Sequence, residues 1–135
     1  MNPKTDPPTP PGGELEMSLL TELWRRHPAT VRQLHETVGV PRGIVYTTVA
    51  KVLDRMVDKG LVGRRAVGRA YEYEPLVDRG ATHRAMARDF LARLGGDPGR
   101  PAVAALVGAL EDADPELLDE LEAELSAWRE RNDGT

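Results

Sequence analysis

"VYTTVAKVLDRMVDKGLV", residues Val45 to Val62, is the most informative part of this sequence. β-branched residues are frequent in it, and such residues are common in strands. Its apolar positions nevertheless recur three and four residues apart, which is the spacing of one helix face. Packing against a core outweighs the weak helix-propensity penalty of β-branched residues, and Gly60 is typical of the residue just beyond a helix. The sequence therefore predicts a helix over residues 44–59, with an apolar face made of Val45, Val49, Val52, Leu53, Met56 and Val57.

The other face of this predicted helix combines small hydroxyls with long cations. Thr47 and Thr48 can hydrogen-bond a base or a phosphate, and a threonine methyl can pack on the thymine methyl. Lys51 follows one turn later and suits guanine or phosphate, whereas Arg55, another turn along, suits the DNA backbone. This face is either an ordinary solvated surface or a DNA-contacting one, and the flanking elements decide between them.

Two further helices are predicted ahead of this one. The first covers residues 14–26 and carries a leucine-rich stripe. Thr30 is the predicted N-cap of a second, shorter helix that continues to about Val38. His35 is expected on the solvated side of that helix. "GVPRG", residues 39–43, then predicts a turn between helices, because glycine and proline disfavour a continuous helix.

A hairpin is predicted after the long helix, in "LVGRRAVGRAYEYEP", residues 61–75. The tyrosines and glutamates of "YEYE" alternate as they do on a strand, and Gly68 with Arg69 supplies the turn. Three helices followed by a two-stranded wing make a winged helix-turn-helix. The chain is therefore predicted to be mainly α-helical.

A winged helix-turn-helix places the second helix of the motif in the major groove, with its N-terminal residues at the base edges. By this geometry the helix 44–59 reads bases through Thr47, Thr48 and Lys51, and the wing 61–75 contacts the backbone or the minor groove. Contacts to the DNA backbone are predicted for the side chains of the turn, helix and wing at Arg42, Tyr46, Arg55, Arg64, Arg65 and Arg69.

Charge and composition divide the chain into three parts. Residues 1–13 hold five prolines and two glycines and are predicted to form a disordered tail. Residues 14–75, the predicted DNA-binding domain, hold ten Lys or Arg against eight Asp or Glu, whereas residues 76–135 hold seven against thirteen. A basic middle in a chain of net charge -4 favours a polyanionic partner for that part alone.

The acidic part, residues 76–135, is predicted to be a helical dimerisation region. After the break "GGDPGRP" the residues Asp114 and Pro115 favour the start of a last helix. Two-fold operators are read by dimers, so the apolar stripes of this region are expected to join two copies of the chain. The predicted dimerisation residues are Phe90, Leu94, Leu117, Leu121, Leu125 and Trp128.

Other classes of function find little support in the sequence. The three histidines lack metal-ligand spacing, no catalytic set is recognisable, and neither an enzyme nor a cofactor is predicted. The absence of cysteine and of an apolar run of roughly 20 residues favours a cytoplasmic protein without a membrane partner. A sequence-specific DNA-binding protein is therefore predicted. The alternative is a winged-helix module that binds proteins and lacks specific DNA binding, and the basic helix face favours DNA binding.

Residues 13–75 resemble the penicillinase-repressor family, which includes the BlaI, MecI and CopY regulators. The matching segments are "GELEMSLLTELW", "PATVRQLHE", "YTTVAKVLDRMVDKGLV" and "GRAYEYEP", in the family's order and spacing. The resemblance implies a homodimeric repressor that binds a dyad operator. By the family's pattern Thr47, Thr48, Lys51 and Arg55 occupy recognition-helix positions, and Arg69 occupies the wing tip.

The sequence departs from the family's pattern in ways that leave operator and inducer open. Ala50-Lys51 stands where the family often has Met-Thr, so a different operator is expected. The Asn-Phe bond at which penicillinase repressors are cleaved is absent, as are the paired cysteines of the copper-responsive branch. A heme or another small effector is one remaining alternative, with His83 as its candidate residue.

Overall fold

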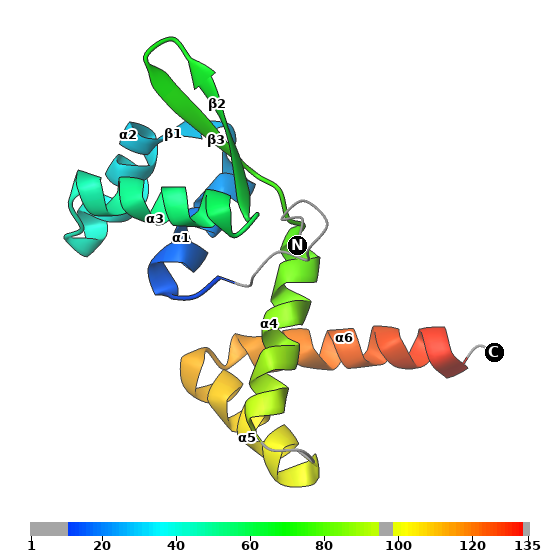
Figure 1. Ribbon diagram of the computed structural model, residues 1–135. Helices are drawn as coiled ribbons and strands as arrows, with labels where there is room; N and C mark the ends of the chain where they lie inside the picture. The colour runs from blue at the N-terminus through cyan, green and yellow to red at the C-terminus, as the bar shows by residue number, and fades with distance from the viewer. Residues whose placement is uncertain (1–10, 95–98, 134–135) are drawn as a thin grey trace. The chain divides into compact units, whose positions relative to one another are not determined.

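The computed structural model describes residues 11–94 and 99–133. They form two compact units, the first ending at Met86 and the second beginning at Ala87 (Figure 1). The predicted disordered tail lies outside the described residues as far as residue 10. Within the described ranges no helix is long and apolar enough to cross a membrane.

Three helices and a small sheet build the first unit, as the sequence predicts. Helix α1 spans Glu14–Arg25, helix α2 spans Val31–Leu34 and helix α3 spans Tyr46–Asp58. Helix α2 is shorter than predicted, because the chain continues in a π-helical turn over His35–Gly39 and a 3₁₀ turn over Val40–Arg42.

Thr30 caps α2, as predicted, through a reciprocal pair of hydrogen bonds. The backbone N–H of Gln33 donates to Thr30 Oγ1 at 3.1 Å, and the backbone N–H of Thr30 donates to Gln33 Oε1 at 2.9 Å. This capping box satisfies two backbone donors that a helix start otherwise leaves without partners.

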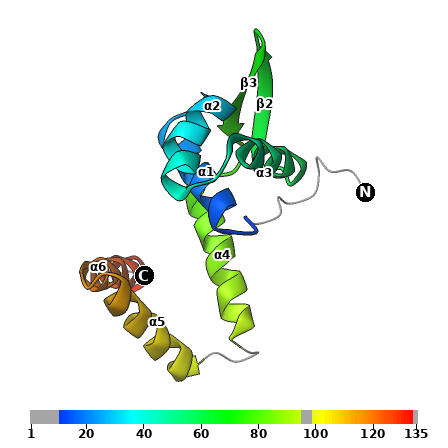
Figure 2. The same ribbon diagram turned by 90° about the vertical axis from the view of Figure 1, so that its left-hand side faces the viewer.

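The wing is part of a three-stranded antiparallel sheet rather than a two-stranded ribbon. Strands β2 (Val62–Val67) and β3 (Ala70–Pro75) form the predicted hairpin, and Gly68 in its turn has a φ of 62°. The short strand β1 (Ala29–Thr30) pairs with the other edge of β3, which gives the order β1-β3-β2. In Figures 1 and 2 the tip of the hairpin projects beyond the helices of this unit.

The core of the first unit lies where the helices meet the base of the sheet. Its largest fully buried side chains include Leu19, Leu20, Leu23, Leu34, Val49, Leu53, Met56, Leu61, Val62 and Tyr73. Val45 is not among them, and its predicted place on the apolar face is wrong: it is the extended N-cap residue of α3 and is 62% exposed. Helix α3 therefore begins two residues later than predicted, and its buried stripe begins at Val49.

Helix α4 (Arg79–Arg93) begins in the first unit and is attached there by its N-terminal turn. The carboxylate of Asp78 accepts a hydrogen bond from the backbone N–H of Ala81 at 2.9 Å. The indole N–H of Trp24 in α1 donates to the carbonyl of Val77 at 3.0 Å, and the Trp24 ring meets the His83 ring edge-on at 5.6 Å. The unit boundary at Met86 consequently falls inside α4.

The second unit contains helix α5 (Gly99–Ala113) and helix α6 (Glu116–Asp133) in addition to the end of α4. Asp114 begins α6 as predicted, since its carboxylate accepts the backbone N–H of Glu116 at 3.0 Å. Among the described residues of this unit only Ala102 is buried. A unit with so little interior leaves its apolar side chains at the surface.

Candidate nucleic-acid interface

Helix α3 presents the predicted polar face to solvent because its opposite face belongs to the core. Val49, Val52, Leu53 and Met56 are buried, whereas Thr47, Thr48, Lys51 and Arg55 are all exposed. Across the part of the chain that the structure describes, Lys51 and Arg55 make no hydrogen bond or ion pair. Two unengaged cations beside two hydroxyls form a surface that an anionic partner can neutralise.

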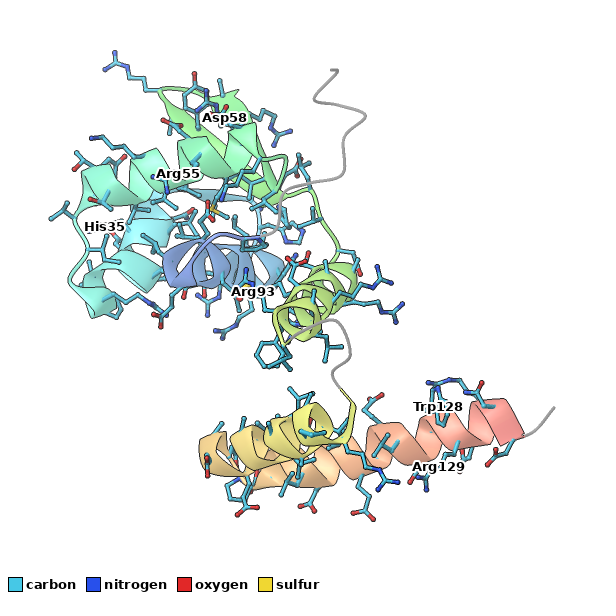
Figure 3. All side chains as sticks on the ribbon, turned by 60° about the horizontal axis from the view of Figure 1, so that its bottom comes forward. His35, Arg55, Asp58, Arg93, Trp128 and Arg129 are labelled. Carbon is cyan, nitrogen blue, oxygen red and sulfur yellow. The ribbon has the colours of Figure 1, made fainter. Side chains whose placement is uncertain are left out.

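The N-terminal end of α3 is held by His35, whose predicted solvated position is wrong. The ring is half-buried, its Nε2 lies 3.0 Å from the carbonyl oxygen of Ile44, and it meets the Tyr46 ring edge-on at 5.8 Å. Gly39 leaves room for this ring, because a Cβ there would lie 2.7 Å from His35 Cδ2. In the sequence, Gly39 was the feature that could have indicated that the His35 ring packs against the backbone. Figure 3 shows His35 near the start of α3 and Asp58 near its end.

Tyr46 and Arg42 lie at the start of the interface. Tyr46 is exposed beside the His35 ring. Arg42 is also exposed, but its guanidinium donates to the carbonyl of Val38 at 3.1 Å and to the hydroxyl of Ser18 at 3.0 Å. Arg42 therefore ties the turn before α3 to α1, and only part of its donor set is free for a phosphate.

The three arginines of the wing have different surroundings. Arg69 is exposed in the hairpin turn, and no ion pair engages it among residues 11–94 and 99–133. Arg65 Nη2 lies 3.7 Å from Oε1 of its cross-strand neighbour Glu72. Arg64 donates to the carboxylate of Asp54 at 2.7 Å, and its guanidinium carbon lies 4.6 Å from the centre of the Tyr71 ring.

The surroundings of Arg64 favour its charged form. The Tyr73 side chain is the largest influence and raises the pKa of Arg64 above its ordinary value; desolvation acts in the opposite sense, and Asp54 adds to the rise. An arginine is protonated at any physiological pH. The arginine of the Asp54–Arg64 pair is therefore charged throughout the physiological pH range.

Two carboxylates for which the sequence predicted no role lie on the exposed side of α3. Asp54 and Asp58 follow Lys51 at helical spacing, and both are exposed. Asp54 is paired with Arg64, whereas Asp58 has no hydrogen bond or ion pair within the described ranges. The spacing was readable from the sequence, but the partner on the wing was not, because it depends on how the hairpin packs.

A largely buried ion pair joins the end of α3 to the start of α1. Lys59, the C-cap residue of α3, places its Nζ 2.8 Å from Glu16 Oε2 in the first turn of α1. The backbone N–H of Gly12 donates to the same oxygen. Glu16 is 4% exposed, and its second carboxylate oxygen is buried without a hydrogen bond. This pair connects the recognition helix to α1 at the end remote from His35.

The predicted dimerisation residues are largely at the surface. Phe90, Leu94, Leu125 and Trp128 are exposed, and Leu117 and Leu121 are half-buried. Figure 3 shows Trp128 and Arg129 on α6 and Arg93 at the end of α4. Trp128 keeps 53% of its surface exposed, which is a large exposure for the biggest apolar side chain of the unit.

Comparison with known proteins gives one family. The family model described as penicillinase repressor matches residues 12–127. The curated transcriptional regulator BlaI of Mycobacterium tuberculosis, in strains CDC 1551 / Oshkosh and ATCC 25618 / H37Rv, is 38% identical over 117 residues, or 82% of this chain and 85% of each relative. Among solved structures, the PcaV transcriptional regulator of Streptomyces coelicolor, in complex with its natural ligand, is 24% identical with a TM-score of 0.46, covering 78% of this chain and 79% of that one.

Proposed function

Because this chain belongs to the penicillinase-repressor family, we propose that it is a homodimeric repressor that reads a dyad operator. The chain is a DNA-binding transcriptional regulator with a winged helix, and it is not an enzyme. The proposal adds to this the residues that meet DNA, the dimer and the two-fold operator. Its place of action is the cytoplasm, where a regulator of this family reaches DNA.

One observation supports the base-reading part of the proposal above all others. Helix α3 buries one face in the core and exposes Thr47, Thr48 and Lys51 on the other. In a helix-turn-helix protein these N-terminal and central positions of the recognition helix meet base edges in the major groove. Lys51 reads guanine in this scheme, and the threonine methyls meet thymine methyls.

The backbone contacts surround this helix. They position the protein on the duplex without reading sequence. Arg69, exposed in the hairpin turn, is proposed to enter a minor groove, because narrow minor grooves attract arginine. The full set of proposed backbone contacts is Arg42, Tyr46, Arg55, Arg64, Arg65 and Arg69.

The homodimer is proposed to form through the acidic region 76–135. The supporting observation is that its apolar side chains stay exposed in a single chain, among them Phe90, Leu94, Leu125 and Trp128. Burying a leucine removes it from water with a gain of roughly 1.5–3 kcal/mol. A second copy doubles each of these gains, because a two-fold interface uses every residue twice.

Selection from random oligonucleotides with the purified full chain tests the function. We expect an enriched sequence made of two half-sites related by a dyad. Affinity for it should fall steeply with salt, since each neutralised phosphate contributes about -0.9 to the slope of log affinity against log salt concentration. Several arginines in each of two subunits predict a slope steeper than about -4. No enrichment, together with a slope near zero, would reject the repressor in favour of a protein-binding winged helix.

A further inference from the structure

Asp54 occupies an unfavourable place for a DNA-binding surface. It lies on the exposed side of α3, one turn beyond Lys51, with 61% of its side chain exposed. A carboxylate on a surface that approaches phosphates is repelled by them. If charge alone mattered, the recognition helix would bind DNA better without it.

We propose that Asp54 is a positioning residue, which fixes Arg64 of the wing for contact with the DNA backbone. This inference rests on the proposed function. Asp54 contacts the wing and not its own helix: its carboxylate accepts from Arg64 Nη1 at 2.7 Å, although Lys51 and Asp58 are its neighbours at helical spacing. The short distance is that of a charge-assisted hydrogen bond.

Tyr71 supplies the second side of the same site. Arg64 and Tyr71 lie on one face of the hairpin, and the guanidinium carbon is 4.6 Å from the centre of the ring. A guanidinium over an aromatic ring keeps its in-plane N–H groups available. An arginine has five such donors, and Asp54 engages one of its nitrogen atoms. The Tyr73 side chain, on the neighbouring strand, also interacts with the guanidinium. In the proposed role, the donors that are left meet a phosphate of the DNA backbone.

The sign of one substitution separates positioning from simple repulsion. Asp54→Asn preserves the size of the side chain and removes its charge. Simple electrostatics predicts that this variant binds DNA more tightly. Positioning predicts weaker binding, because Arg64 loses its charged anchor and must be ordered again when DNA binds.

Asp58 provides the matched control. It lies on the same helix, is exposed, and has no hydrogen bond or ion pair in the part of the chain that the structure describes. Asp58→Asn removes the same charge without removing a contact to the wing. It should therefore bind DNA as tightly as the wild type or more tightly.

The experiment measures the affinity of full-length variants for the selected DNA over a range of salt concentrations. We expect Asp54→Asn to weaken binding about fivefold per half-site, the upper range for an exposed ion pair. The salt slope should become shallower by up to about 1 per subunit, as for a lost phosphate contact. In an Arg64→Ala background, Asp54→Asn should no longer weaken binding, because the residue it positions is gone.

A spectroscopic measurement distinguishes positioning from a general effect on stability. In the free protein the Arg64 side-chain proton resonances should be shifted by the Tyr71 ring, and Asp54→Asn should reduce this shift while the unfolding midpoint stays the same. Asp54→Glu, which keeps the charge, should restore part of both the shift and the affinity. Tighter binding by Asp54→Asn, or equal loss in the Arg64→Ala background, would overturn the inference. A wild type that binds no DNA would instead overturn the proposed function on which it rests.

Discussion

For Lys51, the role predicted from the sequence and the position in the structure agree. It is exposed on α3 between the threonines and Arg55, with no partner of its own among the described residues. As a base-reading residue it should contribute to discrimination and not only to affinity. Lys51→Ala is expected to cost roughly 1–3 kcal/mol on the selected operator and to relax the preference at one position. Binding measured on the operator and on single-base variants of it checks this.

Arg65 is the comparison for Lys51, because it lies on the wing and is proposed to contact phosphate alone. Arg65→Ala should weaken all sequences alike and make the salt slope shallower by about 1. The contact with Glu72 contributes little that would mask this effect, because it is long, at 3.7 Å, and the Arg65 side chain is 76% exposed. Equal losses for Lys51→Ala on operator and random DNA would reassign Lys51 to the backbone.

The positions of individual side chains are also what the sequence predicted least well. Val45 fits the helical apolar period, yet it is exposed, because the chain is still extended at that residue and α3 begins at Tyr46. His35 has a polar side chain on a short helix, yet the π-helical turn rotates it toward Ile44 and Tyr46. Periodicity assumes a regular helix, so it fails at helix ends and at irregular turns.

At the scale of helices and strands, most of the DNA-binding unit was predictable. Helix α3 is specified locally by its apolar stripe of Val49, Val52, Leu53 and Met56. The hairpin is specified locally by its turn at Gly68 and Arg69. Strand β1 was not predictable, because two residues show no alternation and pair with β3 only through the tertiary fold. The Asp54–Arg64 contact has the same origin: both residues are visible in the sequence, but the packing of hairpin on helix brings them together.

The Glu16–Lys59 pair gives a prediction for the connection between α1 and α3. Lys59→Ala leaves the buried carboxylate of Glu16 without its cation and should cost about 3 kcal/mol of unfolding free energy. The double variant Glu16→Leu/Lys59→Met replaces both charges by apolar groups and should recover most of that loss. Urea denaturation of the wild type and these variants measures the difference.

Lys59 is less buried than Glu16, and this difference provides a control for the comparison of the variants. Its side chain is 22% exposed against 5% for Glu16, so removal of the lysine should cost more than removal of the glutamate. Two results would contradict the view that the uncompensated carboxylate of Glu16 causes the loss. One is a larger loss of unfolding free energy in Glu16→Leu than in Lys59→Ala. The other is a double variant that is no more stable than Lys59→Ala.

At the scale of the whole molecule, the two units have unequal interiors. The first encloses a leucine-rich core, whereas Ala102 is the single buried residue in the described part of the second. The first unit also extends to Met86, past the end of the wing, and Trp24 holds Val77 through a hydrogen bond at 3.0 Å. A chain ending at Met86 should therefore be more stable than one ending at Pro75, by about 1 kcal/mol for the hydrogen bond alone.

Truncation at Met86 also tests the proposed dimer, because it removes the proposed dimerisation residues and retains the proposed DNA contacts. A monomeric winged helix contacts one half-site, and two-fold symmetry is needed to engage both halves of a dyad at once. The truncated chain should sediment as a monomer and bind a single half-site as well as the full chain's subunit does. Its affinity for the complete dyad should fall by roughly 10²-fold or more, since linked binding sites gain 10²–10⁴ in avidity.

In the full chain, Leu125→Glu with Trp128→Glu should produce the same selective loss by placing charges in the proposed interface. If the intact protein sediments as a monomer at micromolar concentration, or if the truncated chain binds the dyad undiminished, the acidic region does not join the two copies.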